Sequence, residues 1–305
     1  MTILKKMPLQ DINLLMDYAK TDSSIWNKLI GCGIAHYKLG NGTINKIKSE
    51  KHGTYIFVDF SSRKDVQFNI NAIDKGILKD LRISNKLYLG MLQHHRKRTD
   101  KKDRDLKAKL KEYKIESLWY ITHIDSLLSI IENGILCRNY IKEKQIECKD
   151  ISNENVQTRR TSIHNQVNLY FANNTSMLYV VIQKFGESII LLEIDALPIM
   201  KNQPQFADGN AASNNTAIYD DLKDLDRLNW EIIYNREPEY YGDNKRIRAA
   251  EVLVEKQVPP SCIKTIHVQC TKSKQLTQNI QKMSGRSDIP IKIDLTARGV
   301  FSHQR

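Results

Sequence analysis

Residues 248–254 read Arg-Ala-Ala-Glu-Val-Leu-Val, and the interpretation of the chain depends on this short stretch. The apolar, partly β-branched run at 252–254 is typical of a buried strand. Glu251 stands at the mouth of that strand, where a carboxylate costs free energy unless it is hydrogen-bonded, paired or used in chemistry. Either Glu251 is a structural strand-end residue paired with Arg248 or Arg246, or it is catalytic. The upstream sequence bears on that choice.

Length and composition are those of an ordinary globular protein. The chain has 305 residues, of which 41% are apolar and 27% are charged, which predicts one large domain with a small one or two medium domains. No apolar run approaches the roughly 18 residues of a membrane helix, and the first seven residues lack the apolar core of a signal peptide. We therefore expect a cytoplasmic protein with no membrane partner.

The cysteines suggest neither a disulfide framework nor a metal site. They number five, and none forms a Cys-x-x-Cys pair. An odd count without close pairs argues against a disulfide-built or zinc-ribbon fold. No Cys/His spacing is typical of metal ligands elsewhere in the chain, so we expect no metal.

The charge balance is strongly basic. The formal net charge is +12 with a pI near 9.3, which favours a polyanionic partner such as nucleic acid. Solubility or an acidic protein partner are the alternatives. The excess is greatest at 94–104, His-His-Arg-Lys-Arg-Thr-Asp-Lys-Lys-Asp-Arg. This run either follows a phosphate backbone or is the solvated face of a helix.

The N-terminal part predicts helices over 1–30 and then a small β-barrel. From 31 to 85, short alternating runs are joined by tight polar turns. The block resembles SH3-like or Tudor-like modules at His36, Leu39, Gly40, Gly42, Thr43, Ile44, Val58 and Phe60. Such barrels bind nucleic acid, RNA polymerase or other proteins and are not usually catalytic, so we interpret His36 as structural. Residues 86–114 are expected to form a basic linker helix.

Residues 115–305 carry an ordered series of blocks. In chain order these are a strand ending in Thr122-His123, a helix ending at Asn133-Gly134, Asn-Val-Gln-Thr-Arg-Arg at 155–160, Val-Asn-Leu-Tyr-Phe at 167–171, and the stretch at 248–254. Together they resemble the DarT-like nucleic-acid ADP-ribosyltransferases over nearly all of 116–270. There are two departures from the family pattern. The usual Val-Pro before Tyr-Phe is Val167-Asn168-Leu169 here, and the Pro before Met177 is absent.

The resemblance implies an α+β ADP-ribosyltransferase domain with a split β-sheet core and flanking helices. It also implies NAD as the co-substrate and Glu251 as the catalytic residue. Breaking the bond between nicotinamide and ribose develops positive charge on the ribose, which a fixed carboxylate stabilises. The same carboxylate can act as the base for an acceptor nitrogen. No Gly-x-Gly-x-x-Gly loop is present, so this is not expected to be a Rossmann NAD site.

The resemblance also assigns candidate binding residues. For NAD they are His123, Thr122, Arg159, Arg160, Tyr170 and Phe171. One of the two arginines would form a bidentate contact with the pyrophosphate, and the sequence does not decide which. One of the two aromatic residues would stack on nicotinamide, although Phe171 is as well suited to core packing. A lone His at a strand-to-helix junction is also typical of a structural residue.

The loop before the catalytic strand is expected to contact the acceptor. It interleaves aromatic and basic side chains, a pattern that suits an unpaired base with neutralised phosphates. The candidate nucleic-acid-binding residues are Tyr240, Lys245, Arg246 and Arg248. A charged surface loop with a few packed aromatics is the alternative.

We expect a toxin that transfers ADP-ribose from NAD to bases of single-stranded DNA, in a toxin–antitoxin or anti-phage defence system. RNA is the alternative acceptor. The residues also allow protein-directed ADP-ribosylation, or a non-catalytic nucleic-acid-binding protein on the same fold. By resemblance, the partner is an antitoxin, either a macrodomain hydrolase that reverses the mark or a protein that masks the toxin.

Overall fold

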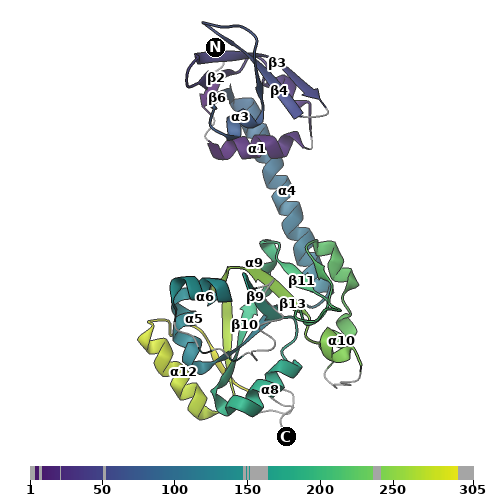
Figure 1. The fold of residues 1–305 in the computed structure, drawn as a ribbon, viewed down its shortest axis with the longest axis vertical. Coiled ribbons are helices and arrows are strands. Elements are labelled where there is room, and N and C mark those ends of the chain that lie inside the picture. The colour runs from purple at the N-terminus through teal and green to yellow at the C-terminus, as the bar shows by residue number, and fades with distance from the viewer. Residues whose placement is uncertain are drawn as a thin grey trace. The chain divides into compact units, whose positions relative to one another are not determined.

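The computed structural model describes residues 4–6, 9–20, 22–50, 53–146, 149, 151, 164–235 and 242–294. The chain forms two compact units, Met1–Arg104 and Asp105–Arg305 (Figure 1). Among the described residues, no helix is long and apolar enough to cross a membrane. The finer boundaries predicted at 30, 85 and 114 stay predictions.

The N-terminal unit is one antiparallel sheet packed against short helices. Its elements are β1 (Leu4–Lys6), α1 (Leu9–Ala19), α2 (Ile25–Lys28), β2 (Gly33–His36), β3 (Gly40–Glu50), β4 (Gly53–Phe60), β5 (Val66–Asn69), α3 (Asn71–Asp74) and β6 (Leu78–Ser84). The strand order is β1-β6-β2-β3-β4-β5. Alternate residues of β4, Ile56, Val58 and Phe60, are fully buried and form the centre of its core. Their spacing of two is the one expected for a strand with one face in a core.

The predicted strands are present, but the described pairing does not establish a barrel. No pairing between β1 and β5 occurs in the part of the chain that the structure describes, so the sheet is open there and the SH3-like barrel stays a prediction. Gly42 of β3 has a clear packing reason, because a Cβ atom would lie 2.7 Å from side-chain atoms of Val58 and Phe60. His36 accepts backbone N–H bonds from Lys38 and Leu39 and thereby closes the turn into β3.

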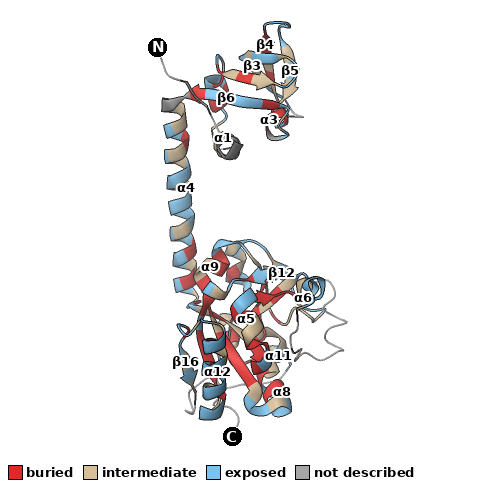
Figure 2. Cartoon of the chain, turned by 90° about the vertical axis from the view of Figure 1, so that its left-hand side faces the viewer, coloured by how far each residue is buried: buried red, intermediate tan, exposed pale blue. Residues whose placement is uncertain are grey.

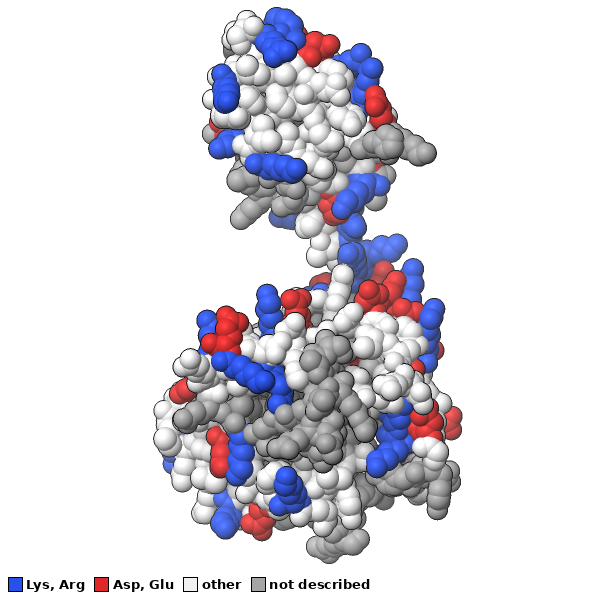
Figure 3. All heavy atoms as spheres, viewed as in Figure 1, with Lys and Arg blue, Asp and Glu red and all other residues white. Residues whose placement is uncertain are grey.

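Helix α4 (Asn85–Glu112) carries the basic run. Met91 near its start belongs to the core of the N-terminal unit, and Leu106 and Leu110 near its end belong to that of the C-terminal unit. Between them most side chains are exposed. On the face shown in Figure 3, the described Lys and Arg side chains are interspersed with Asp and Glu. The contact of residues 94–104 with a phosphate backbone stays a prediction.

The C-terminal unit is built on a mixed eight-stranded sheet of order β12-β11-β13-β9-β7-β10-β15-β16. Its strands are β7 (Ser117–His123), β8 (Ile135–Leu136), β9 (Gln166–Tyr170), β10 (Ile189–Asp195), β11 (Gln205–Ala207), β12 (Ile218–Tyr219), β13 (Glu251–Glu255), β14 (Gln257–Val258), β15 (Ile263–Val268) and β16 (Ile291–Ile293). Strands β8 and β14 form a separate two-stranded ladder.

Helices flank both faces of this sheet. They are η1 (Ile124–Ser126), α5 (Leu127–Asn133), α6 (Arg138–Lys144), α8 (Ser176–Phe185), η3 (Gly186–Ser188), α9 (Ala196–Lys201), η4 (Leu222–Arg227), α10 (Trp230–Tyr234), α11 (Asn244–Ile247), η5 (Pro260–Cys262) and α12 (Thr271–Met283). The first four residues of the central strand β10 are all buried, so both of its faces are covered, and Figure 2 shows buried residues in the interior of this unit. Ile190 and Leu192 belong to the larger hydrophobic cluster, whereas Ile189 and Leu191 belong to a smaller cluster that includes α8.

The sheet is split between β7 and β9. These strands pair at one position, Trp119 with Tyr170, whereas β7 pairs with β10 from Ser117 to His123 and β9 pairs with β13 along its whole length. The sheet is therefore two half-sheets joined by a single rung. The predicted α+β fold with a split sheet and flanking helices is confirmed.

A buried polar network ties the half-sheet of β7, β10, β15 and β16 together. Glu193 of β10 accepts hydrogen bonds from Ser117 Oγ at 2.7 Å and His267 Nε2 at 3.1 Å, and Lys264 Nζ lies 3.3 Å away. The other nitrogen of His267 lies 2.6 Å from Asp294. Burial alone would raise the pKa of Glu193, but these hydrogen bonds and the charge of Lys264 outweigh it and lower the pKa to about 2.

Candidate active site

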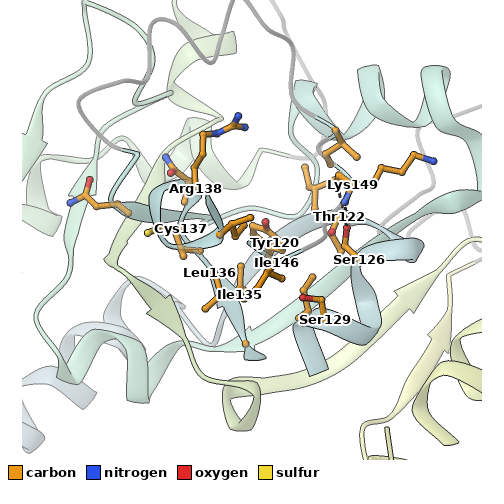
Figure 4. A pocket seen from close by; sticks show the side chains of 18 of the residues that line it. Tyr120, Thr122, Ser126, Ser129, Ile135, Leu136, Cys137, Arg138, Ile146 and Lys149 are labelled. Atoms are coloured by element: carbon orange, nitrogen blue, oxygen red, sulfur yellow. Dashed lines mark hydrogen bonds between the residues drawn. The ribbon is translucent and has the colours of Figure 1, made fainter. Parts of the chain in front are cut away.

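A cavity of about 370 Å³ lies at the split in the sheet. It is bounded by β7 and β9 on the sheet side and by η1, α5, β8 and α6 on the other (Figure 4). Both apolar and polar side chains line it, among them Tyr120, Thr122, Ile135, Cys137, Asn168 and Tyr170. Its volume is in the range typical of small-ligand sites.

Three basic side chains are among the residues that line this cavity. Arg138, Lys142 and Lys149 are among its lining residues, and Figure 4 shows Arg138 and Lys149 on opposite sides. Arg138 is half-buried, whereas Lys142 and Lys149 are exposed. A pyrophosphate needs such cationic and hydrogen-bonding partners, so the cavity suits the diphosphate of a dinucleotide.

Glu251 begins β13 and is completely buried. Its Oε2 atom accepts a hydrogen bond from Asn168 Nδ2 at 2.6 Å and a longer one from the Ala211 N–H at 3.4 Å. The strand register pairs Glu251 with Tyr170 and places Asn168 opposite Leu253. Glu251, Asn168 and Tyr170 therefore share one sheet face, and two of them line the cavity.

Thr122 and His123 end strand β7, and both are 4% exposed. Thr122 lines the cavity. His123 Nδ1 accepts the Asp125 N–H at 3.1 Å and thereby caps η1, while the ring meets Phe185 edge-on. Burial lowers the pKa of His123 and outweighs the opposing charge of Asp125. The lowered pKa favours the neutral imidazole, and the neutral form that accepts the Asp125 N–H at Nδ1 carries its proton on Nε2.

The two candidate aromatic residues lie on opposite faces of the sheet. Tyr170 is 8% exposed and lines the cavity. Phe171 is 1% exposed, belongs to the larger hydrophobic cluster and meets Trp230 edge-on at 5.1 Å. The structure brings Tyr170 to the cavity and places Phe171 in the core, as in the core-packing alternative.

Arg248 and Arg246, predicted to contact nucleic acid, are held by protein groups. Arg248 is 3% exposed and donates to the backbone carbonyls of Asn235 and, at 3.2 Å, Asn174. The Arg246 side chain is 15% exposed and binds Asp243, Asp208 and Thr216. Their predicted contacts with nucleic acid stay predictions.

The other predicted residues divide into two groups. Lys245 lies on α11 and is exposed, so its contact with nucleic acid also stays a prediction. Arg159, Arg160 and Tyr240 lie outside the described residues, and their roles stay predictions too.

The sequence interpretation missed the polar partners of Glu251. From sequence, Asn168 is named only as part of a departure from the family pattern, and no role is assigned to Ala211. The strand at 166–170 alternates as Gln-Val-Asn-Leu-Tyr, which puts Asn168 on the face opposite the apolar Val167 and Leu169, so the pattern gave no signal for its contact with Glu251. Among the described residues, no group of three or more His, Cys, Asp or Glu side chains is placed to hold a metal ion.

A protein-family model matches most of the C-terminal unit. The model described as "ssDNA thymidine ADP-ribosyltransferase, DarT" matches residues 119–298, more than half of the chain. The match includes Glu251, Asn168 and the cavity, and it starts after the N-terminal unit.

Two curated proteins are similar in sequence. A DNA ADP-ribosyl transferase-DNA ADP-ribosyl glycohydrolase fusion protein of Thermosipho africanus is 31% identical over 198 residues, which cover 60% of this chain and 49% of that protein. A DNA ADP-ribosyl transferase of Thermus sp. is 28% identical over 173 residues, which cover 50% of this chain and 80% of that protein. The chain therefore spans about half the length of the first relative.

Solved structures agree on the fold. Thermosipho africanus DarTG in complex with ADP-ribose matches with a TM-score of 0.50 and 28% identity, over 59% of this chain and 50% of that one. Thermus sp. DarT in complex with ADP-ribosylated ssDNA matches with a TM-score of 0.52 and 24% identity, over 59% of this chain and 94% of that one.

Proposed function

Because the chain belongs to the DarT family of ADP-ribosyltransferases, we propose that it transfers ADP-ribose from NAD to thymine bases of single-stranded DNA. The observation that carries the proposal is Glu251, a buried carboxylate of the matched region with two neighbours that line the cavity at the split. A carboxylate fixed on a rigid strand suits a reaction that develops positive charge.

Glu251 would act on both halves of the reaction. As the bond from nicotinamide to ribose C1′ breaks, its electron pair stays with nicotinamide, and the Glu251 carboxylate stabilises the cationic ribose. Thymine in DNA carries one N–H, at N3, because N1 is bonded to deoxyribose. Glu251 would take that proton as the N3–C1′ bond forms.

The cavity residues would hold NAD. Thr122 can hydrogen-bond a ribose, Tyr170 can stack on nicotinamide, and Arg138 and Lys149 can neutralise the pyrophosphate. His123, neutral and capping η1, would keep the end of β7 in place beside them. Arg159 or Arg160 remains the proposed bidentate arginine.

We also propose a partner and a cellular setting. The Thermosipho relative joins a transferase to a DNA ADP-ribosyl glycohydrolase in one chain. This supports a toxin–antitoxin pair in which a hydrolase, by family resemblance of the macrodomain type, removes the mark. The protein would act in the cytoplasm, where NAD and DNA are both available. The role in anti-phage defence stays a prediction.

The test measures transfer from labelled NAD to matched acceptors. Wild type, Glu251→Gln and the control Glu255→Gln are incubated with single-stranded oligonucleotides with and without thymine, with RNA and with cell protein. Glu255 suits the control because it is exposed and lies on the same strand. We expect label on thymine-containing DNA and a loss on the order of 10²- to 10⁴-fold in Glu251→Gln alone.

Each contrary outcome contradicts part of the proposal. Label on RNA or protein alone would refute the DNA acceptor. Equal labelling of DNA without thymine would refute the base assignment. A Glu251→Gln variant as active as wild type would refute the catalytic assignment.

A further inference from the structure

We infer that Asn168 is a positioning residue for Glu251, and that Arg246 fixes the loop that supplies a second hydrogen bond to the same carboxylate oxygen. This inference rests on the proposed function, because it concerns how the catalytic carboxylate is oriented. Asn168 lies where the chain departs from the resembled family pattern.

The contact between Asn168 and Glu251 spans neighbouring strands β9 and β13. The two residues are diagonal neighbours on one sheet face, since Glu251 pairs with Tyr170 and Asn168 pairs with Leu253. At 2.6 Å, the contact from Asn168 Nδ2 to Oε2 is a short hydrogen bond. It restricts rotation of the carboxylate about its terminal bond.

The second donor comes from loop 208–217, which joins β11 to β12. The Ala211 N–H lies 3.4 Å from the same Oε2 atom. Two donors on one oxygen, one from a strand and one from a loop, define the plane of the carboxylate more tightly than either could alone. The position of this loop therefore matters for the orientation of Glu251.

Arg246 holds loop 208–217 at both ends. Its Nη1 atom donates to Asp208 Oδ1 at 2.7 Å and to Thr216 Oγ1 at 3.2 Å. Its backbone oxygen accepts the Asn210 N–H at 3.0 Å. The guanidinium packs so closely over Gly209 that a Cβ atom there would come into steric conflict with Nη1. The loop is thus shaped around this arginine.

The guanidinium itself is anchored from its other side. Arg246 Nε and Nη2 each donate to the Asp243 carboxylate at 2.7 Å, a bidentate contact. Arg246 and Asp243 lie at α11, a few residues before Glu251 in the chain. The chain that leads into β13 therefore also determines where the Ala211 N–H points.

The isosteric variant Asn168→Asp tests the hydrogen bond without changing side-chain volume. Aspartate replaces the donor by an acceptor beside Glu251, and two close carboxylates cannot both ionise readily. As pH falls, one proton shared by the pair would restore a donor. Asn168→Ala removes the donor at every pH. Gln205→Ala is the matched control, because Gln205 is an exposed amide on β11 of the same sheet.

The closing experiment compares kcat, KM for NAD and pH profiles of these variants on thymine-containing single-stranded DNA. We expect kcat to fall roughly 10- to 100-fold in Asn168→Asp and Asn168→Ala, with KM for NAD changed less than about threefold. Relative to wild type, Asn168→Asp should recover as the pH falls from 8 to 5, and Asn168→Ala should not. Arg246→Met should also lower kcat.

Several results would overturn the inference. The role of Asn168 would be refuted if Asn168→Asp had the kcat and pH profile of wild type while Glu251→Gln was inactive. Wild-type kcat in Arg246→Met would refute the loop role. If Arg246→Met fails to fold, Thr216→Val tests the loop role instead, because it removes one contact to the guanidinium. A wild-type kcat in Thr216→Val would refute that role.

Failure of the proposed function gives a different pattern. If wild type leaves single-stranded DNA unlabelled, the acceptor is wrong. The ratio of variant to wild-type kcat is then measured for hydrolysis of NAD to free nicotinamide, and this ratio decides the inference. Absence of both reactions in wild type would refute both proposals.

Discussion

Replacing Glu193 by Gln should destabilise the C-terminal unit in a pH-dependent way. A carboxyl pKa lowered from 4.5 to about 2 in the folded state corresponds to about 3 kcal/mol of stability at neutral pH. Because the folded pKa is lowered, this stability is complete above pH 4.5 and disappears as the pH falls from 4.5 through 2. Lys264 is 40% exposed, so salt should screen its share and the measured value should be somewhat smaller.

Urea unfolding followed by tryptophan fluorescence at pH 7, 5, 4 and 3 measures this difference. Trp119 lies beside His267 of the network, with ring centroids 5.4 Å apart, and reports on this region. The free energy of unfolding should differ by about 2–3 kcal/mol between wild type and Glu193→Gln at pH 7, and the difference should shrink at pH 3. Glu187→Gln, at an exposed position nearby, should behave as wild type. A difference that stays constant from pH 7 to 3 would refute the reasoning.

Three further predictions concern packing, capping and thiol reactivity. Gly42→Ala should lower the melting temperature of the N-terminal unit through overpacking worth about 1–3 kcal/mol, since a Cβ atom there would meet core side chains at 2.7 Å; an unchanged melting temperature would contradict this. Thr175→Ala removes the side-chain cap of α8 and should cost about 1 kcal/mol in urea unfolding, whereas Thr175→Ser should retain the cap. Burial raises the pKa of Cys32 and Cys262, so at pH 8 their thiolate fraction is small. Mass spectrometry should show that iodoacetamide alkylates Cys270, which is more exposed, before either of these two cysteines; earlier labelling of Cys32 or Cys262 would contradict this.

The strand that contains Glu251 was predictable because its signal is local. Three consecutive apolar residues after a carboxylate predict a buried strand, and β13 starts at Glu251. The split in the sheet was predicted from the family resemblance alone, because neither composition nor periodicity shows which strands fail to pair. The sequence left Tyr170 and Phe171 as alternatives: alternation puts adjacent strand residues on opposite faces, but only the structure shows that the cavity lies on the side of Tyr170.

The role of Arg248 could not be predicted from sequence. Its partners are the backbone carbonyls of Asn235 and Asn174, which lie 13 and 74 residues away and carry no side-chain signature. Arg246 is similar, since its contacts to Asp208 and Thr216 cross from one loop to another. From sequence alone, a basic residue just before a strand is expected to face solvent. Only the positions of the surrounding loops show that it is bound by protein groups.

The single rung between β7 and β9 has a consequence for evolution. Beyond Trp119 and Tyr170 the described ladder between these strands stops, and residues of both strands line the cavity at this split. Peptide groups are the same whatever side chain they carry. A ligand seated in the split would therefore be contacted partly by main chain, and substitutions of the surrounding side chains would leave those contacts in place.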